Sequence, residues 1–201
     1  AIPATANVFA GGVAGIVLAS GDSGSTWSTK AGGNAVSYFG SSFTDASNGW
    51  VAGENGTMIH TTDGGVTWTS DNSGIDDNAD MHGVSFINNT LGFSVGTIPG
   101  APNTAVAYKY TTGTWAPMTI TGGASYLSSV KMFDITNCWA VGEEGFILHP
   151  TDGSTRPMAR PNTTDRLTSV AKTPVTNCRA SGPLTLLPGI PYAADSHAHI
   201  L

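Results

Sequence analysis

Acidic and amide side chains in glycine-rich segments are the residues of this sequence best suited to recognition chemistry. Glu54 and Asn55 lie in the segment GENG, while Glu143 and Glu144 lie in the segment GEEG. Tyr126 belongs to another polar segment. Carboxylates and amides at loop tips can bind sugar hydroxyls, and an aromatic ring can stack on the apolar face of a sugar. These residues are therefore candidates for binding a neutral glycan, the alternative being loops that are polar because they are solvated.

A second acidic group has the ligand types that a calcium ion prefers. Asp76, Asp77, Asn78 and Asp80 lie within five residues of one another, and carboxylate and amide oxygens are typical Ca²⁺ ligands. The segment lacks the spacing of an EF-hand loop, and a solvated acidic loop is the alternative. Ca²⁺ is thus a possible cofactor that the sequence does not require.

Catalytic patterns are weak in this sequence. Glu54 together with Glu143 or Glu144 could form the carboxylate pair of a glycoside hydrolase, but the sequence does not fix their separation. We find no Ser-His-Asp motif, phosphate-binding loop or nucleotide fingerprint. The prediction is a protein that is not an enzyme.

Composition narrows the class of partner. The chain has 201 residues, a net charge of −6 and only eight basic residues, so nucleic acid and anionic membranes are disfavoured as partners. No apolar run approaches the roughly 20 residues of a membrane-spanning helix. The sequence begins with AIPATA and no initiator Met, which predicts a processed and exported, or secreted, protein.

The elements that would position these residues come from an internal repeat. A marker position is held by Phe9, Trp50, Phe93, Trp139 and Arg179, at intervals of 40 to 46 residues. Each unit predicts four short strands separated by Gly- and Asp-rich turns, which is the period of a β-propeller. We therefore predict a single all-β domain, a five-bladed propeller, with repeats over residues 1–33, 34–77, 78–121, 122–164 and 165–201.

One turn of the unit carries a family resemblance. Ser20-x-Asp22-x-Gly24-x-x-Trp27 and Thr61-x-Asp63-x-Gly65-x-x-Trp68 resemble the Asp-box, or BNR repeat, of sialidase-like propellers. The whole unit is most similar to the repeat of photosystem II assembly and stability factors. The resemblance implies a structural role, with the Asp closing its turn and the Trp packing between sheets, for the following residues: Asp22, Gly24, Trp27, Asp63, Gly65, Trp68 and Asp152. Sialidases of this class use an arginine triad, whereas all four arginines here fall in the last two units.

Departures from the repeat give further expectations. The third unit has Tyr110 where the Asp belongs, which predicts a looser outer turn. The first unit begins where its first strand should end, so the C-terminal tail either closes the ring or forms the last strand of the fifth unit. Cys138 and Cys178 are predicted to be two separate thiols. His60 and His149 hold equivalent positions and are predicted to be surface residues of outer strands.

Two functions remain open at this level. The first is a lectin-like module that binds carbohydrate at several weak sites, strengthened by multivalency. The alternative is a protein-binding scaffold or assembly factor, as the family resemblance implies. A scaffold predicts one patch with large exposed apolar residues, whereas a lectin predicts similar aromatic and polar pockets that recur around the ring. Low charge and polar loops favour the lectin.

Overall fold

The computed structural model describes residues 8–31, 36–149, 165–172 and 178–181. This part of the chain is built of antiparallel strands with a single 3₁₀ turn, η1 (Glu143–Gly145). The all-β prediction is confirmed. None of the described helical structure is long and apolar enough to span a membrane. The strands are β1 (Val8–Gly11), β2 (Ile16–Ser20), β3 (Ser28–Ala31), β4 (Tyr38–Phe43), β5 (Gly49–Gly53), β6 (Met58–Thr61), β7 (Thr69–Ser70), β8 (Asp80–Asn88), β9 (Leu91–Ile98), β10 (Thr104–Thr111), β11 (Thr114–Pro117), β12 (Leu127–Met132), β13 (Cys138–Gly142), β14 (Ile147–Leu148), β15 (Ser169–Lys172) and β16 (Cys178–Ser181).

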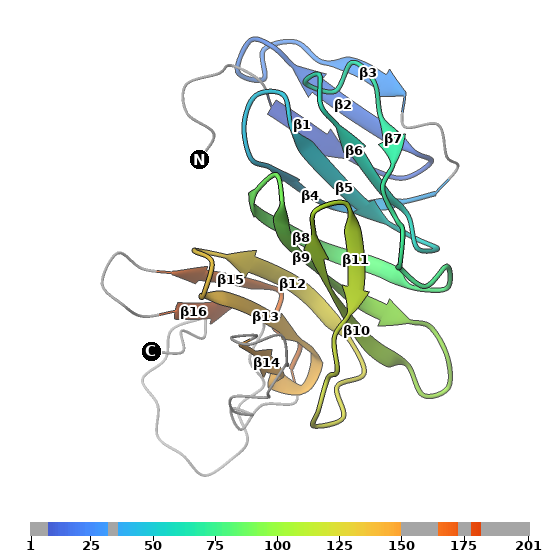
Figure 1. Ribbon diagram of the computed structural model, residues 1–201, viewed down its shortest axis with the longest axis vertical. Coiled ribbons are helices and arrows are strands. Elements are labelled where there is room, and N and C mark those ends of the chain that lie inside the picture. The colour runs from blue at the N-terminus through green and yellow to red at the C-terminus, as the bar shows by residue number, and fades with distance from the viewer. Residues whose placement is uncertain (1–7, 32–35, 150–164, 173–177, 182–201) are drawn as a thin grey trace.

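These strands form five antiparallel sheets that follow one another along the chain. Sheet 1 is β1–β3, sheet 2 is β4–β7, sheet 3 is β8–β11, sheet 4 is β12–β14 and sheet 5 is β15–β16. Each sheet is a meander of consecutive strands, because short turns favour pairing between neighbours in sequence. Figure 1 shows the sheets as blades stacked in a curved series, with sheets 1 and 5 at its two ends.

The first strands of sheets 2 to 5 lie on one side of this series. Strands β4, β8, β12 and β15 contact one another in succession. Sheet 1 has no such strand among the described residues, because its first described strand, β1, carries the marker Phe9 and pairs with β2. The described residues do not show a closed ring, and the C-terminal tail that might close it lies outside them. Closure and the count of five blades therefore stay predictions.

The interface between sheets 2 and 3 holds the largest buried aromatic cluster. The Trp50 ring lies between His60 and Phe86, at centroid distances of 4.1 and 3.7 Å. Trp115 is 1% exposed, and its Nε1 donates a hydrogen bond to the Asp71 backbone oxygen over 2.8 Å. Burial of these rings is a main source of folding free energy.

The two histidines at equivalent positions are not the surface residues that the sequence predicted. His60 is half-buried against Trp50, and His149 is half-buried 4.2 Å from the Trp139 ring. Within the described residues, the Nε2 atoms of both have no hydrogen-bond partner. Their burial on a large marker ring lowers the pKa of both imidazoles. Cys138 is also buried, as a free thiol whose pKa is raised by desolvation.

The Asp-box turns of sheets 1 and 2 share one hydrogen-bond pattern. Asp63 Oδ1 accepts from the Thr67 backbone N over 2.9 Å and Asp63 Oδ2 from the Thr67 hydroxyl over 2.6 Å. Asp22 bonds Thr26 in the same way, at 2.8 and 2.6 Å. Donation by the threonine side chain and backbone lowers the pKa of both carboxyls to about 2. Asp152 lies outside the described residues.

The Asp-box tryptophans differ from one another. Trp68 packs edge-on against Phe43, with a centroid distance of 6.2 Å, between sheets 1 and 2. Trp27 was expected between sheets as well, but it is 45% exposed and its Nε1 donates to the Gly24 oxygen of its own turn. The expectation for Trp27 is wrong because no described sheet lies on its outer side, where sheet 1 begins the series.

The outer turn of sheet 3 is tight, which corrects the predicted loosening. Thr112 and Gly113, with φ of 48° and 92°, form a two-residue link between β10 and β11. Tyr110, in the place of the missing Asp, lies opposite Trp115 across this hairpin. Two positive φ values are typical of a type I′ turn, whose twist matches paired strands, so the turn needs no carboxylate to close it.

Candidate functional site

The loops on one edge of the sheets, which we call the loop face, are fixed by a repeated backbone hydrogen bond. The N–H groups of Gly15, Gly56 and Gly145 donate to carbonyl oxygens of the next sheet's entry segment, at 2.6 to 3.0 Å. The acceptors are Val36, Ala79 and Asp165. All three glycines have φ between 65° and 68°, a conformation that glycine adopts without strain. Because of this bond, the residues that directly follow the three acceptors hold equivalent positions at three interfaces between sheets.

Three aromatic or heteroaromatic rings and a guanidinium form a continuous row across the loop face. The Phe39 and His82 rings are 5.1 Å apart, and the His82 and Tyr126 rings stack at 4.4 Å with planes 23° apart. The Arg166 Cζ lies 4.2 Å from the Tyr126 ring centroid. Each member comes from a different sheet entry, from sheet 2 to sheet 5. We call these four residues the loop-face row.

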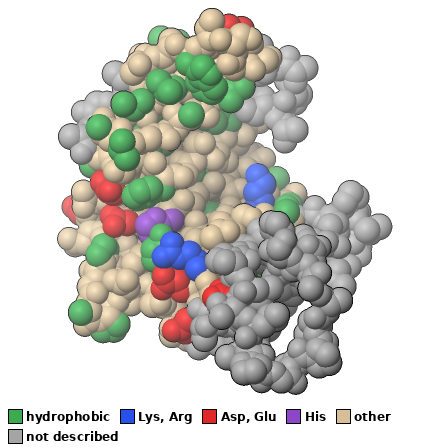
Figure 2. All heavy atoms as spheres, turned by 180° about the vertical axis from the view of Figure 1, so that it is seen from behind, with side chains coloured by type: hydrophobic (Ala, Val, Ile, Leu, Met, Phe, Trp, Pro, Cys, Tyr) green, Lys and Arg blue, Asp and Glu red, His purple; other side chains and the backbone are tan. Residues whose placement is uncertain are grey.

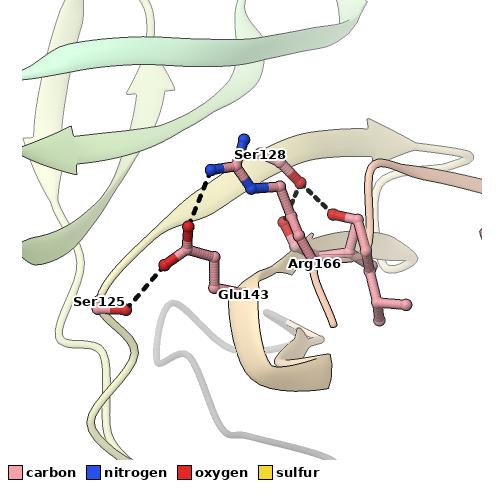
Figure 3. Close-up of polar contacts among 6 residues, drawn as sticks. Ser125, Ser128, Glu143 and Arg166 are labelled. Carbon is pink, nitrogen blue, oxygen red and sulfur yellow. Dashed lines mark hydrogen bonds and ion pairs between the residues drawn. The ribbon is translucent and has the colours of Figure 1, made fainter. Parts of the chain in front are cut away.

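Arg166 is held in the row by an ion pair. Its Nη2 lies 2.8 Å from Glu143 Oε1, and Glu143 Oε2 accepts a hydrogen bond from the Ser125 hydroxyl over 3.3 Å (Figure 3). The two charged side chains are 46% and 32% exposed. The pair is therefore largely solvated and can reorganise when a ligand approaches.

The electrostatics of the row follow from partial burial among charges. Burial lowers the pKa of His82, with Asp80 acting in the opposite direction and Arg166 in the same one. Burial raises the pKa of Tyr126, an effect that Arg166 opposes and that Glu143 and Asp80 increase. At neutral pH both rings are therefore uncharged, and the charges of the row lie at its rim.

The first strands of three sheets, together with Thr168, line a hollow of about 350 Å³ that shares two residues with the row. These two residues are Phe39 and His82, and much of the remaining wall is glycine and serine. On one face of the molecule, Figure 2 shows histidine next to hydrophobic, basic and acidic side chains. The lining residues are Phe39, Gly40, Ser41, His82, Gly83, Val84, Ser128, Ser129, Val130, Lys131 and Thr168.

The predicted binding residues divide between two regions of the loop face. Tyr126 and Glu143 meet Arg166 at the entry to sheet 5. Glu54 lies in the β5–β6 loop of sheet 2, where its Oε2 accepts from the Ser37 backbone N at the entry of the same sheet over 3.0 Å. The two glutamates that were considered as a catalytic pair thus have separate partners in different sheets. Asn55 and Glu144 are exposed loop tips with φ of 53° and 54°.

The acidic segment predicted for calcium is not gathered into a metal site. Asp76 Oδ1 accepts from the Asn78 backbone N and amide, at 2.8 and 3.0 Å, so this carboxylate caps its own turn. Asp80 faces sheet 2 instead, where its Oδ1 accepts from the Asn55 backbone N. Asp77 is exposed at the tip of the same loop. Across the described residues, no three His, Cys, Asp or Glu side chains form a group that could hold a metal ion.

Sequence reasoning missed three members of the loop-face row. Phe39, His82 and Arg166 precede or begin the first strand of their sheets, in segments that the repeat pattern left without a role. Counting back from the marker positions would have aligned Phe39 with His82, and Tyr126 with Arg166. The signal was therefore two pairs of aromatic or cationic residues, each pair at one matched position of two successive units.

Comparison with known proteins confirms the resemblance that the repeat indicated. Residues 28–101 match the family model of the photosynthesis system II assembly factor YCF48. No curated protein matches the chain by sequence.

Solved structures show a propeller-like fold. YCF48 bound to D1 peptide superposes with a TM-score of 0.62 and 19% identity, over 87% of this chain and 58% of that one. YCF48 from Cyanidioschyzon merolae gives 0.62 and 20%, over 88% and 60%. An ancestral GH74 enzyme gives 0.63 and 14%, over 98% and 29%. The chain thus spans less than two thirds of the length of these similar structures.

Proposed function

We propose that this protein is a peptide-binding scaffold and that the loop-face row, with the hollow that Phe39 and His82 line, receives an extended segment of a partner protein. The observation that carries the proposal is the unbroken contact of Phe39, His82, Tyr126 and Arg166 across four sheets. Exposed aromatic and arginine side chains are typical anchors of protein interfaces. The small residues that line the hollow leave room for a bound backbone.

The distribution of the rings supports a scaffold over the lectin that the sequence favoured. A lectin predicts similar pockets between successive blades, whereas the rings here join into one patch. The match to an assembly-factor family and the likeness to YCF48 bound to D1 peptide point to a protein partner. Nothing in the comparisons supports carbohydrate binding, so we do not retain it.

We further propose that the scaffold acts without catalysis. The family match is to an assembly factor, and the likeness to a glycoside hydrolase rests on 14% identity and concerns the fold. In support, Glu143 is engaged by Arg166 and Ser125, while Glu54 serves the Ser37 backbone. Five sheets in chain order likewise support a five-bladed ring with the predicted repeat limits. Export stays a prediction that this function does not require.

Selection from a random peptide library displayed on phage tests the proposal. The full chain is the bait, and a D1 peptide serves as one defined probe. Binding of the selected peptides is then measured by fluorescence anisotropy with the wild type, Phe39→Ala and Val66→Ala. Val66 is 71% exposed in the β6–β7 turn, on the opposite edge of sheet 2, and is the matched apolar control.

We expect Phe39→Ala to weaken peptide binding about tenfold, because truncating an aromatic anchor typically costs more than 1 kcal/mol. Val66→Ala should bind like the wild type. If the library yields no binder, or if both variants lose affinity equally, the loop-face row is not a peptide site. A glycan array run on the same preparation gives the lectin its own test.

A further inference from the structure

The hollow draws its wall from the same four sheets as the loop-face row. The wall is formed by residues of β4, β8 and β12, together with Thr168 at the entry to sheet 5. Phe39 and His82 belong to both the hollow and the row, so the two are continuous. A peptide segment that follows the row from sheet 2 to sheet 5 therefore passes alongside the hollow and can place a side chain in it.

The wall changes in character from sheet 2 to sheet 5. Phe39, His82, Ser128 and Thr168 all line the hollow, and they hold one matched position of four successive units. The first two carry rings, whereas the last two carry hydroxyl groups. The side of the hollow that sheets 4 and 5 form is therefore the polar one.

The charge of the wall comes from Lys131 in β12. Of the described residues that line the hollow, none is Asp or Glu, and His82 is uncharged at neutral pH because burial lowers its pKa. The Lys131 side chain is exposed and makes no ion pair with another described residue. Arg166, the cation of the row, is instead paired with Glu143. An unpaired ammonium in a hollow without carboxylates favours an anionic group.

Lys131 also departs from a structural pattern of the preceding sheets. Ser42 Oγ accepts from the Phe86 backbone N over 2.9 Å, and Ser85 Oγ accepts from the Met132 backbone N over 3.0 Å. Each of these serines thus ties its strand to the first strand of the next sheet. Lys131 holds the same position in sheet 4, but an ammonium has no lone pair with which to accept such a bond. The repeat therefore does not explain a lysine at this position.

Ser129 places a hydroxyl group on the same side of β12 as Lys131. The two residues are two positions apart in a regularly paired part of the strand, so their side chains point to one face. Both line the hollow. The Ser129 hydroxyl has no hydrogen-bond partner among the described residues, whereas the Ser128 hydroxyl donates to the Val141 oxygen. A carboxylate only accepts hydrogen bonds, and the ammonium and the free hydroxyl are both donors.

We propose that the hollow binds the carboxylate of an Asp or Glu side chain of the partner peptide, with the Lys131 ammonium as its ion-pair partner and the Ser129 hydroxyl as a second donor. The inference rests on the proposed peptide-binding function and defines its partner as a segment with an acidic residue. The net charge of the whole chain, −6, does not attract such a segment. Recognition therefore depends on Lys131 locally, which makes a single substitution decisive.

The test uses the tightest peptide from the library selection, synthesised with an amidated C-terminus so that its only carboxylates are side chains. A neutral version replaces every Asp by Asn and every Glu by Gln, and a basic version replaces each of them by Lys. All three are titrated by fluorescence anisotropy against the wild type, Lys131→Met, Lys131→Glu, Ser129→Ala and Lys30→Met. Lys30 lies in β3 of sheet 1 and does not line the hollow, so Lys30→Met is the control for the loss of one positive charge.

We expect the selected peptides to share an Asp or Glu and the neutral version to bind about tenfold more weakly. Lys131→Met should lose as much affinity for the acidic peptide and none for the neutral version, with Lys30→Met near wild type. Ser129→Ala should weaken binding of the acidic peptide about fivefold, by the loss of one hydrogen bond. Lys131→Glu should bind the basic version more tightly than the wild type does, because the ion pair is restored with its charges exchanged. Circular dichroism confirms that each variant is folded.

The outcomes separate this inference from the proposed function. Selected peptides without Asp or Glu that still depend on Phe39 would overturn the acidic ligand and leave the peptide site standing. A dependence on acidic residues that Lys131→Met does not change, or that Lys30→Met reduces equally, would overturn the assignment to the hollow. Unchanged binding to Ser129→Ala would remove the hydroxyl from the site. A library without binders would overturn both proposals.

Discussion

Two groups of rings in this protein stack in the same way, but one is buried and the other is partly exposed. Between sheets 2 and 3, Trp50 is stacked at 3.7 Å on Phe86 and is fully buried. In the loop-face row, His82 stacks on Tyr126 at 4.4 Å, and both rings stay partly exposed. Ring stacking alone therefore does not distinguish a core from a recognition surface. Exposure and the charges at the rim do, and each substitution below tests that distinction.

Removing a ring from the buried cluster should have the largest effect on stability. Trp115→Ala should lower the free energy of unfolding by about 3–5 kcal/mol, because it leaves a cavity and frees the Asp71 carbonyl. Urea denaturation of wild type and variant measures it. Trp27→Ala, at the same position of its unit but 45% exposed, should cost less than about 1 kcal/mol. Equal costs would show that exposure does not divide the rings.

Backbone packing against the same cluster gives the next largest effect. A Cβ on Gly74, where φ is +93°, would lie 2.0 Å from the Trp115 carbonyl oxygen. Gly74→Ala should therefore destabilise the protein by roughly 2–4 kcal/mol, from overpacking added to left-handed strain. Gly113 has φ +92° with nothing within 4 Å of its added Cβ. Gly113→Ala should cost only about 1–2 kcal/mol, and thermal unfolding of the pair separates the two causes.

In the loop-face row, removing a ring should affect peptide binding more than the free energy of unfolding. Tyr126→Ala is expected to change the free energy of unfolding by only about 1 kcal/mol, while it weakens peptide binding about tenfold by removing the support of His82 and Arg166. Tyr126→Phe keeps the ring and should bind like the wild type. A loss of stability as large as that of Trp115→Ala would place Tyr126 in the core instead.

The smallest effect is a dependence of stability on pH that both groups share. Burial lowers the pKa of His60 in the cluster and of His82 in the row below 6.5. The unfolded state therefore binds protons first, so stability should fall as pH drops below 6.5 and through the lower folded values. His60→Gln should flatten this decline in urea titrations between neutral pH and pH 5. A decline unchanged in His60→Gln would assign it to other groups.

The sequence could predict the strands and turns that every repeat shares. It predicted little of how individual residues within one repeat are buried or paired. Marker spacing and the Asp-box turns indicated antiparallel sheets of consecutive strands, because strand pairing and turn closure are local. Trp27 was misplaced because its burial depends on a neighbouring sheet, which no local pattern reveals. The turn after Tyr110 was judged by its missing Asp, although Thr112 and Gly113 set its backbone.

The site shows the same limit. Tyr126 and Glu143 were recognised as polar loop residues, but their partner Arg166 stands in another unit and was considered only as part of an arginine triad. Contacts between sheets arise from the packing of whole units. Sequence patterns within one repeat therefore indicate the loops but not the row that loops of different repeats form together.

The exposed ring of Trp27 gives the protein an intrinsic fluorescent reporter. Buried indoles such as those of Trp50 and Trp115 are shielded from water and from collisional quenchers. Trp27 faces water, so its emission should be red-shifted and open to iodide or acrylamide. Whatever covers the outer side of sheet 1, whether another part of this chain or a second molecule, would remove that quenchable component. A Stern–Volmer titration thus reports whether the outer side of sheet 1 is covered in solution.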